Sequence, residues 1–450
     1  MKPIRYALIL AIVSLFFNLN FANAASVFGK KTVYQCGKQP TFAFGGTEIA
    51  APTPFLICAG QDAAFDGKFD KDKDEMPSVY IFKDSHEMPL MKMNDLNIFP
   101  LSFNLRPGVD ELQGRIYVPS GNYVYMYGFP SFIKKYDSIS VPNAAAVAVD
   151  EKNVYVVSST WGAPGAIRKF KKLDLTKAVD SIEVPANSQH IIALPNETLV
   201  FVNEGTSGKE DSKVIFINNT DKMSVAKELT VGGMGNHLAQ CEDFLYVTMN
   251  GTHKVMIIDW KKQAIVDSIA IPTTGYDGPR ETLLINEAKS KDYKDFEFYT
   301  TAYDGHVYYG KGNKILETSE NNNKKRQGIA YYYNLGKVVV TDISNPDYSP
   351  ATSITFYDRV SSVEANNITN ISVYPNPVVN EINMQIAEIE NASCDVNIFD
   401  ILGNVIANAK SEISNNNLKY NISSLNLAKG TYYVKVKADN KTISSKFVID

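Results

Sequence analysis

Two histidines and an arginine precede segments that read as strands rich in aromatic and β-branched residues. His190 and His237 lie 11 and 9 residues before the aromatic residue of the next such segment, so they hold near-equivalent positions. Arg280 precedes a third segment and Asn143 an earlier one. Histidine titrates near neutral pH and binds metals, and arginine grips a carboxylate or phosphate with a fork of N–H groups. These four residues are therefore candidates for a ligand-binding site.

A plainer interpretation of these residues stays open, in which they are polar side chains that satisfy the backbone of loops at strand starts. Two histidines are also few for a metal site. Arg106 and Asp110 could join them from an earlier segment. The sequence holds no Gly-x-Ser-x-Gly elbow, P-loop or Cys-x-x-Cys-His haem site, so no catalytic residue is assigned.

An acidic run at residues 62–75 offers a different chemistry. Asp66, Asp70, Asp72 and Asp74 lie at short spacings in this run, and oxygen-rich loops suit Ca²⁺. The run is not an EF-hand, because its glycine and closing glutamate are out of place. Its interspersed lysines favour a solvated loop between two strands. Calcium at these four residues is thus one hypothesis, and no other cofactor is expected.

The chain has four cysteines, a low count for its 450 residues. Cys36 and Cys58 both fall near the start of the chain and could form a disulfide in an exported protein, although the sequence does not give their separation. Cys241 and Cys394 read as lone buried residues.

The elements that must position these residues are short strands that repeat. Residues 244–272 read as three strands, with Asn250-Gly251 as a tight hairpin turn between the first two. Their last strand contains Asp-Ser-Ile, which recurs at Asp137, Asp180 and Asp267 with separations of 43 and 87 residues. A period in the low forties with several strands per repeat indicates a β-propeller. The Asp-Ser-Ile copies could be glycosylation acceptors, but a repeated strand position explains them more simply.

Residues 25–358 hold seven candidate blades, with six or eight also open. An early strand, either TVYQ (32–35) or TFAF (41–44), is expected to complete the last blade and close the ring, which removes exposed sheet edges. In a propeller the innermost strand of each blade starts at one mouth of the central channel. His190, His237 and Arg280 would therefore converge at that mouth.

The segments YVTMN (246–250) and VMIID (255–259), with the strand that follows them, resemble the YVTN-repeat β-propeller family. That resemblance implies a secreted or surface-bound propeller. It does not imply an activity, because the family is functionally mixed.

The composition shifts after residue 358. Residues 359–370 are polar, rich in asparagine and typical of a linker. Residues 371–450 alternate like strands separated by Gly and Asn turns, which predicts a small immunoglobulin-like β-sandwich.

This tail resembles the type IX secretion C-terminal sorting domain, type A. The resemblance rests on four blocks: Tyr374-Pro375-Asn376-Pro377, the DILG segment with Gly403, the LAKGTYYVKV segment with Gly430 and Tyr432, and KFVI at residues 446–449. It implies export to the periplasm by the Sec pathway and then passage across the outer membrane. In that family a sorting protease usually removes the tail, and the cargo is released or attached to the surface. Taken alone, the tail could instead be a module that packs or binds.

The start of the chain fits export. Lys2 and Arg5 precede an apolar run at residues 6–17, and Ala22-Asn23-Ala24 forms a small-x-small cleavage site. This predicts a signal peptide at residues 1–24 that is cut after Ala24, with a retained anchor as the alternative. No later stretch is long enough to cross a membrane. The net charge of −4 gives no basic stripe for a nucleic-acid partner.

We therefore expect a secreted or surface-attached propeller that binds a glycan, a protein or a small molecule. The alternative is an extracellular enzyme, either a hydrolase or lactonase or a metal-dependent oxidoreductase, that uses the channel mouth. A second alternative is a structural component of a surface layer.

Overall fold

The computed structural model divides the chain into two compact units, described separately below, with the boundary between Val360 and Ser361. The strands of the first unit end at Arg359 and those of the second begin at Val373, so most of the predicted linker falls outside the described residues. The signal peptide with Ala24 also falls outside them. The described residues are 26–45, 54–81, 91–96, 98–102, 104–128, 135–220, 222–333, 336–359, 373–386, 391–400, 405–438 and 441–449.

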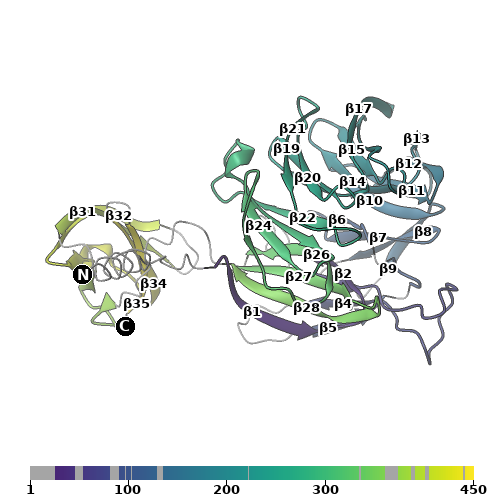
Figure 1. The fold of residues 1–450 in the computed structure, drawn as a ribbon. Helices are drawn as coiled ribbons and strands as arrows, with labels where there is room; N and C mark the ends of the chain where they lie inside the picture. The colour runs from purple at the N-terminus through teal and green to yellow at the C-terminus, as the bar shows by residue number, and fades with distance from the viewer. Residues whose placement is uncertain are drawn as a thin grey trace, which may run out of the picture. The chain divides into compact units, whose positions relative to one another are not determined.

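The first unit is a propeller of seven four-stranded antiparallel sheets, which confirms the predicted fold and blade number (Figure 1). Around most of the ring, the first strands of neighbouring blades contact each other, so these strands lie nearest the central channel. From the inner strand outward, the blades are blade 1, β2 (Pro40–Phe44), β3 (Phe55–Cys58), β4 (Ser78–Ile81), β5 (Met91–Asp95); blade 2, β6 (Gly108–Asp110), β7 (Arg115–Ser120), β8 (Tyr123–Gly128), β9 (Lys135–Ser140); blade 3, β10 (Ala144–Val149), β11 (Asn153–Thr160), β12 (Ala163–Lys171), β13 (Asp180–Val184); blade 4, β14 (Ser188–Leu194), β15 (Thr198–Asn203), β16 (Ser212–Asn218), β17 (Ser224–Gly232); blade 5, β18 (Gly235–Cys241), β19 (Phe244–Met249), β20 (Lys254–Asp259), β21 (Ala264–Ala270); blade 6, β22 (Pro279–Ile285), β23 (Glu297–Ala302), β24 (Val307–Lys311), β25 (Lys314–Thr318); and blade 7, β26 (Lys325–Tyr332), β27 (Lys337–Ser344), β28 (Pro350–Arg359), β1 (Phe28–Gln35).

The ring closes through the first strand of the unit. β1 pairs with β28 so that Val33 faces Thr355, and Figure 1 shows the purple β1 along the green β28. Of the two segments considered for closure, TVYQ (32–35) therefore completes blade 7, whereas TFAF (41–44) lies in the inner strand of blade 1. Closure leaves neither end of the ring with an unpaired sheet edge.

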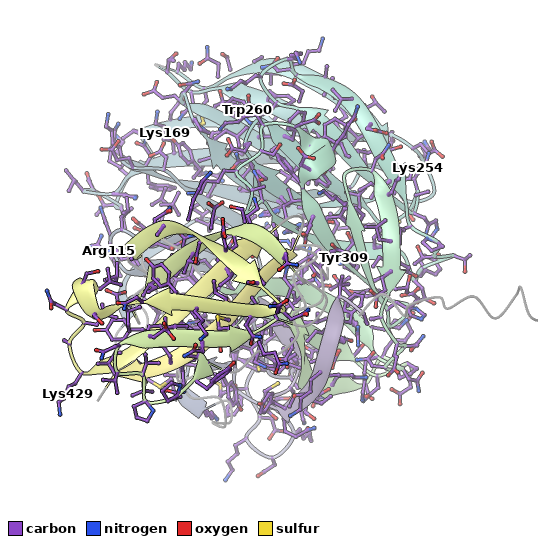
Figure 2. The ribbon with its side chains drawn as sticks, turned by 90° about the vertical axis from the view of Figure 1, so that its left-hand side faces the viewer. Arg115, Lys169, Lys254, Trp260, Tyr309 and Lys429 are labelled. Carbon is purple, nitrogen blue, oxygen red and sulfur yellow. The ribbon has the colours of Figure 1, made fainter. Side chains whose placement is uncertain are left out.

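The middle strands of the blades are buried on both faces because neighbouring blades stack on them. In β19 the side chains of Leu245, Tyr246 and Val247 are fully buried, and Tyr309 of β24, labelled in Figure 2, is 1% exposed. Each such aliphatic side chain contributes about 1.5–3 kcal/mol to the stability. The outer strand β17 instead exposes most of its residues. This explains why the middle strands read as continuous apolar runs.

The Asp-Ser-Ile copies share a local hydrogen bond, and two of them also tie one blade to the next. In each copy the aspartate Oδ1 accepts a hydrogen bond from the N–H of the serine that follows it. Asp180 Oδ2 also accepts the N–H of Met223 in blade 4 at 2.6 Å. Asp267 Oδ2 accepts the hydroxyl of Tyr293, in the short 3₁₀ helix η1 (Tyr293–Asp295) of blade 6, at 2.9 Å. These contacts favour the structural interpretation of the repeat over the glycosylation one.

The second unit is a single seven-stranded sheet that curls until its two edges nearly meet, which confirms the predicted sandwich-like tail. Val378 forms a parallel bridge with Ile449 and closes the gap between the edges. In β31 alternate residues, Cys394, Val396 and Ile398, point into the core. The sheet order is β29 (Val373–Tyr374), β30 (Glu381–Gln385), β33 (Asn417–Asn421), β32 (Val405–Ser414), β31 (Asn391–Phe399), β34 (Gly430–Ala438), β35 (Lys441–Ile449), with the 3₁₀ helix η3 (Ser423–Leu425) after β33.

The sorting motif residues lie where this sheet closes. Asn376 Oδ1 accepts the N–H of Val448 at 2.9 Å and so ties the Tyr374-Pro375-Asn376-Pro377 block to the last strand. Tyr432 stacks on Phe447 with ring centroids 5.7 Å apart. Gly430 begins β34, and Gly403 falls outside the described residues. In the described part of the chain, no helix is long and apolar enough to cross a membrane.

Candidate functional site

A pocket of about 660 Å³ opens on the face of the propeller where the inner strands begin. Its wall comes from the loops that enter the inner strands and from the loops between the second and third strands of the blades. Pockets of this size hold typical small ligands. The pocket is therefore the candidate site.

A β-bulge at the start of the inner strand builds the floor of this pocket. In blades 3, 4 and 5 the pairing register shifts around one extra residue, which is Ala145, Gln189 and Asn236 respectively. Blade 6 has the same shift, between Pro279 and Thr282, and it contains Arg280. All four of these bulge residues line the pocket. A bulge redirects a side chain, so here it turns successive blades toward one cavity.

In blades 3 to 5, a residue with left-handed backbone conformation precedes the bulge. Asn143, Asn187 and Met234 precede the bulge residues of blades 3 to 5 by two positions and have φ of 54°, 60° and 56°. Asparagine tolerates this conformation better than most residues. The Asn187 side chain also accepts the N–H of Gly162 at 2.8 Å and donates to the carbonyl of Gly205 at 3.0 Å. These contacts fix the loops around the pocket.

Three large aromatic side chains stand exposed around the pocket. Trp161, Tyr276 and Tyr348 line it from blades 3, 6 and 7 and are 67%, 77% and 64% exposed. Exposing apolar rings of this size to water costs free energy, and a ligand that covers the rings would remove that cost.

A chain of amide hydrogen bonds crosses the floor. Glu204 accepts from Gln189 Nε2 at 2.9 Å, and Gln189 Oε1 accepts from Asn104 Nδ2 at 2.7 Å. Asn104 Oδ1 accepts from Gln327 Nε2 at 3.0 Å. Burial raises the pKa of Glu204, although the nearby Arg280 charge lowers it in part. The floor is thus a rigid surface of amides with one carboxylate.

Arg280 contacts the far end of this chain of hydrogen bonds, at Gln327. Its guanidinium lies over the ring of Tyr303 at 4.5 Å, and its Nε donates to Gln327 Oε1 at 3.2 Å. The hydroxyl of Tyr303 donates to the same oxygen at 3.0 Å. The arginine is therefore held in one orientation.

A second polar layer lies deeper in the channel. The Arg106 side chain reaches from the start of blade 2 to Asn236 Oδ1 of blade 5, 2.9 Å away, and forms an ion pair with Glu281 of blade 6. Both charged groups of this pair are buried. The side chain of Arg106 thus links blade 2 to blades 5 and 6.

His190 and His237 belong to this deeper layer, and their rings stack at 4.8 Å. His190 Nδ1 accepts the N–H of Leu238, and His237 Nδ1 accepts the N–H of Thr282, each from the next blade, at 3.0 and 3.4 Å. Each ring keeps some surface open to the channel, yet burial holds the pKa of both far below the usual range, helped by the Arg106 charge. The rings are thus neutral, and an accepting Nδ1 places the proton on Nε2.

The four predicted ligand-binding residues therefore separate. Arg280 and Asn143 line the pocket, whereas His190 and His237 lie beneath it. Arg106 joins the histidines, but Asp110 instead pairs with Lys172. Their ligand-binding role stays a prediction. Sequence reasoning missed Gln189, Asn236 and Glu204, and the signal that marks the first two is their place next to the histidines.

Three of the four aspartates predicted to bind calcium accept backbone N–H groups of their own loop. Asp74 accepts the N–H groups of Ala63 and Asp70 at 2.8 and 2.7 Å, and these bonds lower its pKa. Asp66 and Asp70 each accept an N–H two residues on. Within the described ranges, no three His, Cys, Asp or Glu side chains gather as a metal site. Calcium at Asp66, Asp70, Asp72 and Asp74 stays a prediction that this arrangement does not favour.

Cys36 and Cys58 are adjacent free thiols. Burial, with the neighbouring Cys36 thiol adding to it, raises the pKa of Cys58. Their disulfide stays a prediction, although they are neighbours in the fold.

Residues 372–450 match the family model described as a secretion system C-terminal sorting domain. Among solved structures, the WD40 β-propeller domain of Doa1 is 10% identical, with a TM-score of 0.48 over 73% of this chain and 98% of that one. This likeness is too weak to carry an argument. No curated protein sequence matches the chain. The propeller follows from its sheet topology, and the YVTN-repeat resemblance stays a prediction. The tail at residues 372–450 is a type IX sorting domain, and it directs export to the cell surface or the extracellular space.

Proposed function

We propose that this protein is an exported carbohydrate-binding module that holds its ligand in the pocket at the channel mouth. The sorting domain accounts for its delivery outside the cell, where glycans are abundant. The proposal also takes the type IX machinery as the partner of the tail and its sorting protease as the enzyme that removes it.

The observation that carries the proposal is the ring of exposed Trp161, Tyr276 and Tyr348 around an amide-rich floor. The C–H faces of a sugar ring are apolar and can cover aromatic rings, which then lose contact with water. Its hydroxyl groups donate and accept, and so does an amide such as Gln189 or Asn236. A pocket with both kinds of surface suits a saccharide better than a purely apolar ligand.

The pocket supports binding more than hydrolysis. Hydrolysis of a glycosidic bond usually needs two carboxyl groups on either side of the bond. Of the described residues that line the pocket, Glu204 alone carries a carboxyl group. The acidic residue on the inner strand of blade 6, Glu281, does not supply a second carboxyl group to the pocket, because it is buried in its ion pair with Arg106.

A glycan array probed with the full secreted chain tests this proposal. We expect specific saccharide binding that the Trp161→Ala and Tyr348→Ala substitutions each weaken by about two- to tenfold, because each removes a stacking surface worth about 0.5–1.5 kcal/mol. Binding should also change the fluorescence of Trp161, which gives a second readout in solution.

Leu173→Ala provides the matched control, because Leu173 is also a fully exposed apolar side chain but does not line the pocket. It should leave binding unchanged. A protein that binds no saccharide, or whose binding survives both aromatic substitutions, would overturn the proposal. Release of reducing sugar from a bound glycan would replace it with the enzyme alternative.

A further inference from the structure

We propose that the saccharide carries a carboxylate and that Arg280 is the residue that binds it. This inference rests on the proposed function and deepens it, since it names the class of sugar: an acidic one of the uronic type.

Arg280 is buried yet faces the pocket. It is 8% exposed and lines the cavity. Its Nε is bonded to Gln327 and its plane is stacked on Tyr303, so only the two terminal nitrogens are left for a ligand. Neither of them bonds to any described residue, and neither is sealed from solvent. They form a fixed fork at a floor of amides with one carboxylate, that of Glu204.

The charge of Arg280 lacks a close counterion in the described part of the protein. Other buried cations have one: Arg106 pairs with Glu281, and Arg359 with Glu297 at 2.8 Å. Lys169, labelled in Figure 2, is a buried cation that donates to a backbone carbonyl at 3.4 Å instead, but it does not line the pocket. A buried charge is costly unless it is paired. A ligand anion would supply the missing partner.

The shape of the fork favours a carboxylate. Two parallel N–H groups of a guanidinium match the two oxygens of a carboxylate in one plane. A sulfate or phosphate would gain from a second cation. Lys325 lies 5.7 Å from the Tyr303 ring and 4.5 Å from the Tyr348 ring, but it is already paired with Asp277 at 2.9 Å. The floor therefore offers one planar anion site.

Glu204 shares the pocket but does not neutralise Arg280. Its carboxylate is bonded to Gln189 and forms no ion pair with the guanidinium. Its charge still opposes a second anion in the same pocket. Removing that charge should therefore favour an acidic ligand over its neutral counterpart.

The test uses matched probes on the full chain: uronic-acid oligosaccharides, the same oligosaccharides with their carboxyl groups reduced to alcohols, and sulfated oligosaccharides. We expect the acid forms to bind at least about tenfold more tightly than the reduced ones. Arg280→Gln should weaken the acid forms about 10- to 100-fold and the reduced forms little, because a charged hydrogen bond is lost. Arg280→Lys should fall between the two.

Glu204→Gln keeps the test decisive if Arg280 variants do not fold, since it should raise the ratio of acid-probe to reduced-probe affinity several-fold. Equal binding of acid and reduced probes would overturn the carboxylate but leave the proposed function standing. A preference for sulfated probes would also overturn it. Absence of binding to every probe and to a general glycan array would overturn the proposed function itself.

Discussion

Gln189 and His190 are neighbours in the chain, and so are Asn236 and His237. The amide and the histidine of each pair nevertheless have different roles. The amides sit on bulges and line the pocket. The histidines sit one step deeper and accept backbone N–H groups of the next blade. The residue types alone suggest the reverse, because histidine is the residue more often associated with chemistry.

The difference teaches that the bulge decides which residue meets the ligand. Inner strands of a propeller have one edge free toward the channel, and their N–H groups there need acceptors. The histidines supply them from one blade to the next, in blades 4 and 5. The extra residue in the bulge is not needed for this purpose and lines the pocket, although Asn236 also accepts a hydrogen bond from Arg106 of the deeper layer. The channel thus has a structural layer beneath a recognition layer.

Loss of the buried Glu281 side chain should have the largest effect. Glu281→Ala leaves the Arg106 charge buried without its partner, which costs about 3–5 kcal/mol of unfolding free energy. Denaturant unfolding followed by tryptophan fluorescence measures it. Both tryptophans, Trp161 and the buried Trp260, lie in the propeller, so the signal does not include the sorting domain (Figure 2).

The double substitution Arg106→Met, Glu281→Met is the control for this prediction. It removes both charges together and should recover most of the loss. If the single and double variants are equally unstable, the ion pair is not what holds the deeper layer together, and packing alone must explain it.

Loss of either histidine side chain should have the second-largest effect on the unfolding free energy. His190→Leu and His237→Leu each leave a strand-edge N–H without an acceptor, at about 1–3 kcal/mol each. Saccharide binding should persist in the folded variants. A variant that stays as stable as the wild type but loses binding would reverse the assignment of the two layers.

His190 and His237 should also cause part of the pH dependence of the unfolding free energy. Burial lowers the folded pKa of both rings, so below the ordinary value of 6.5 the unfolded chain takes up protons that the folded chain does not. Stability is therefore complete above pH 6.5 and falls as the pH drops below it. Denaturant midpoints between pH 7.5 and 5 should fall less in the double His→Leu variant. An unchanged slope would contradict neutral buried rings.

The sequence predicted the scaffold better than the site, for a physical reason. A period of about one blade shows in Asp137, Asp180 and Asp267 because every copy makes the same local hydrogen bond. The left-handed residue before each bulge varies between Asn143 and Met234, and the bulge residue varies from Ala145 to Arg280, so no common letter marks them. Which strand closes the ring also depended on a pairing between the two ends of the unit.

A substitution in the recognition layer should change binding more than stability. Gln189→Ala removes the amide between Glu204 and Asn104, but the side chain lies at the pocket and is only partly buried. We expect a loss of less than about 1 kcal/mol of unfolding free energy and a several-fold weaker affinity for saccharide. Isothermal titration alongside denaturant unfolding compares the two. A larger loss of stability than that of His190→Leu would dissolve the distinction between the layers.

A substitution at Ala145 should have the smallest effect on the unfolding free energy and the largest effect on binding. Its place on the bulge of blade 3 is equivalent to that of Gln189 and Asn236, so its side chain also faces the pocket. Ala145→Trp adds bulk into open space and should change the unfolding free energy by less than about 0.5 kcal/mol, the usual range for surface sites. It should also block the pocket. Ala146→Trp, one residue on at a fully buried site, is the contrast: it should overpack the apolar cluster that blades 3 and 4 share and cost about 1–3 kcal/mol. If the two variants behaved alike, the bulge would not be what separates recognition from support.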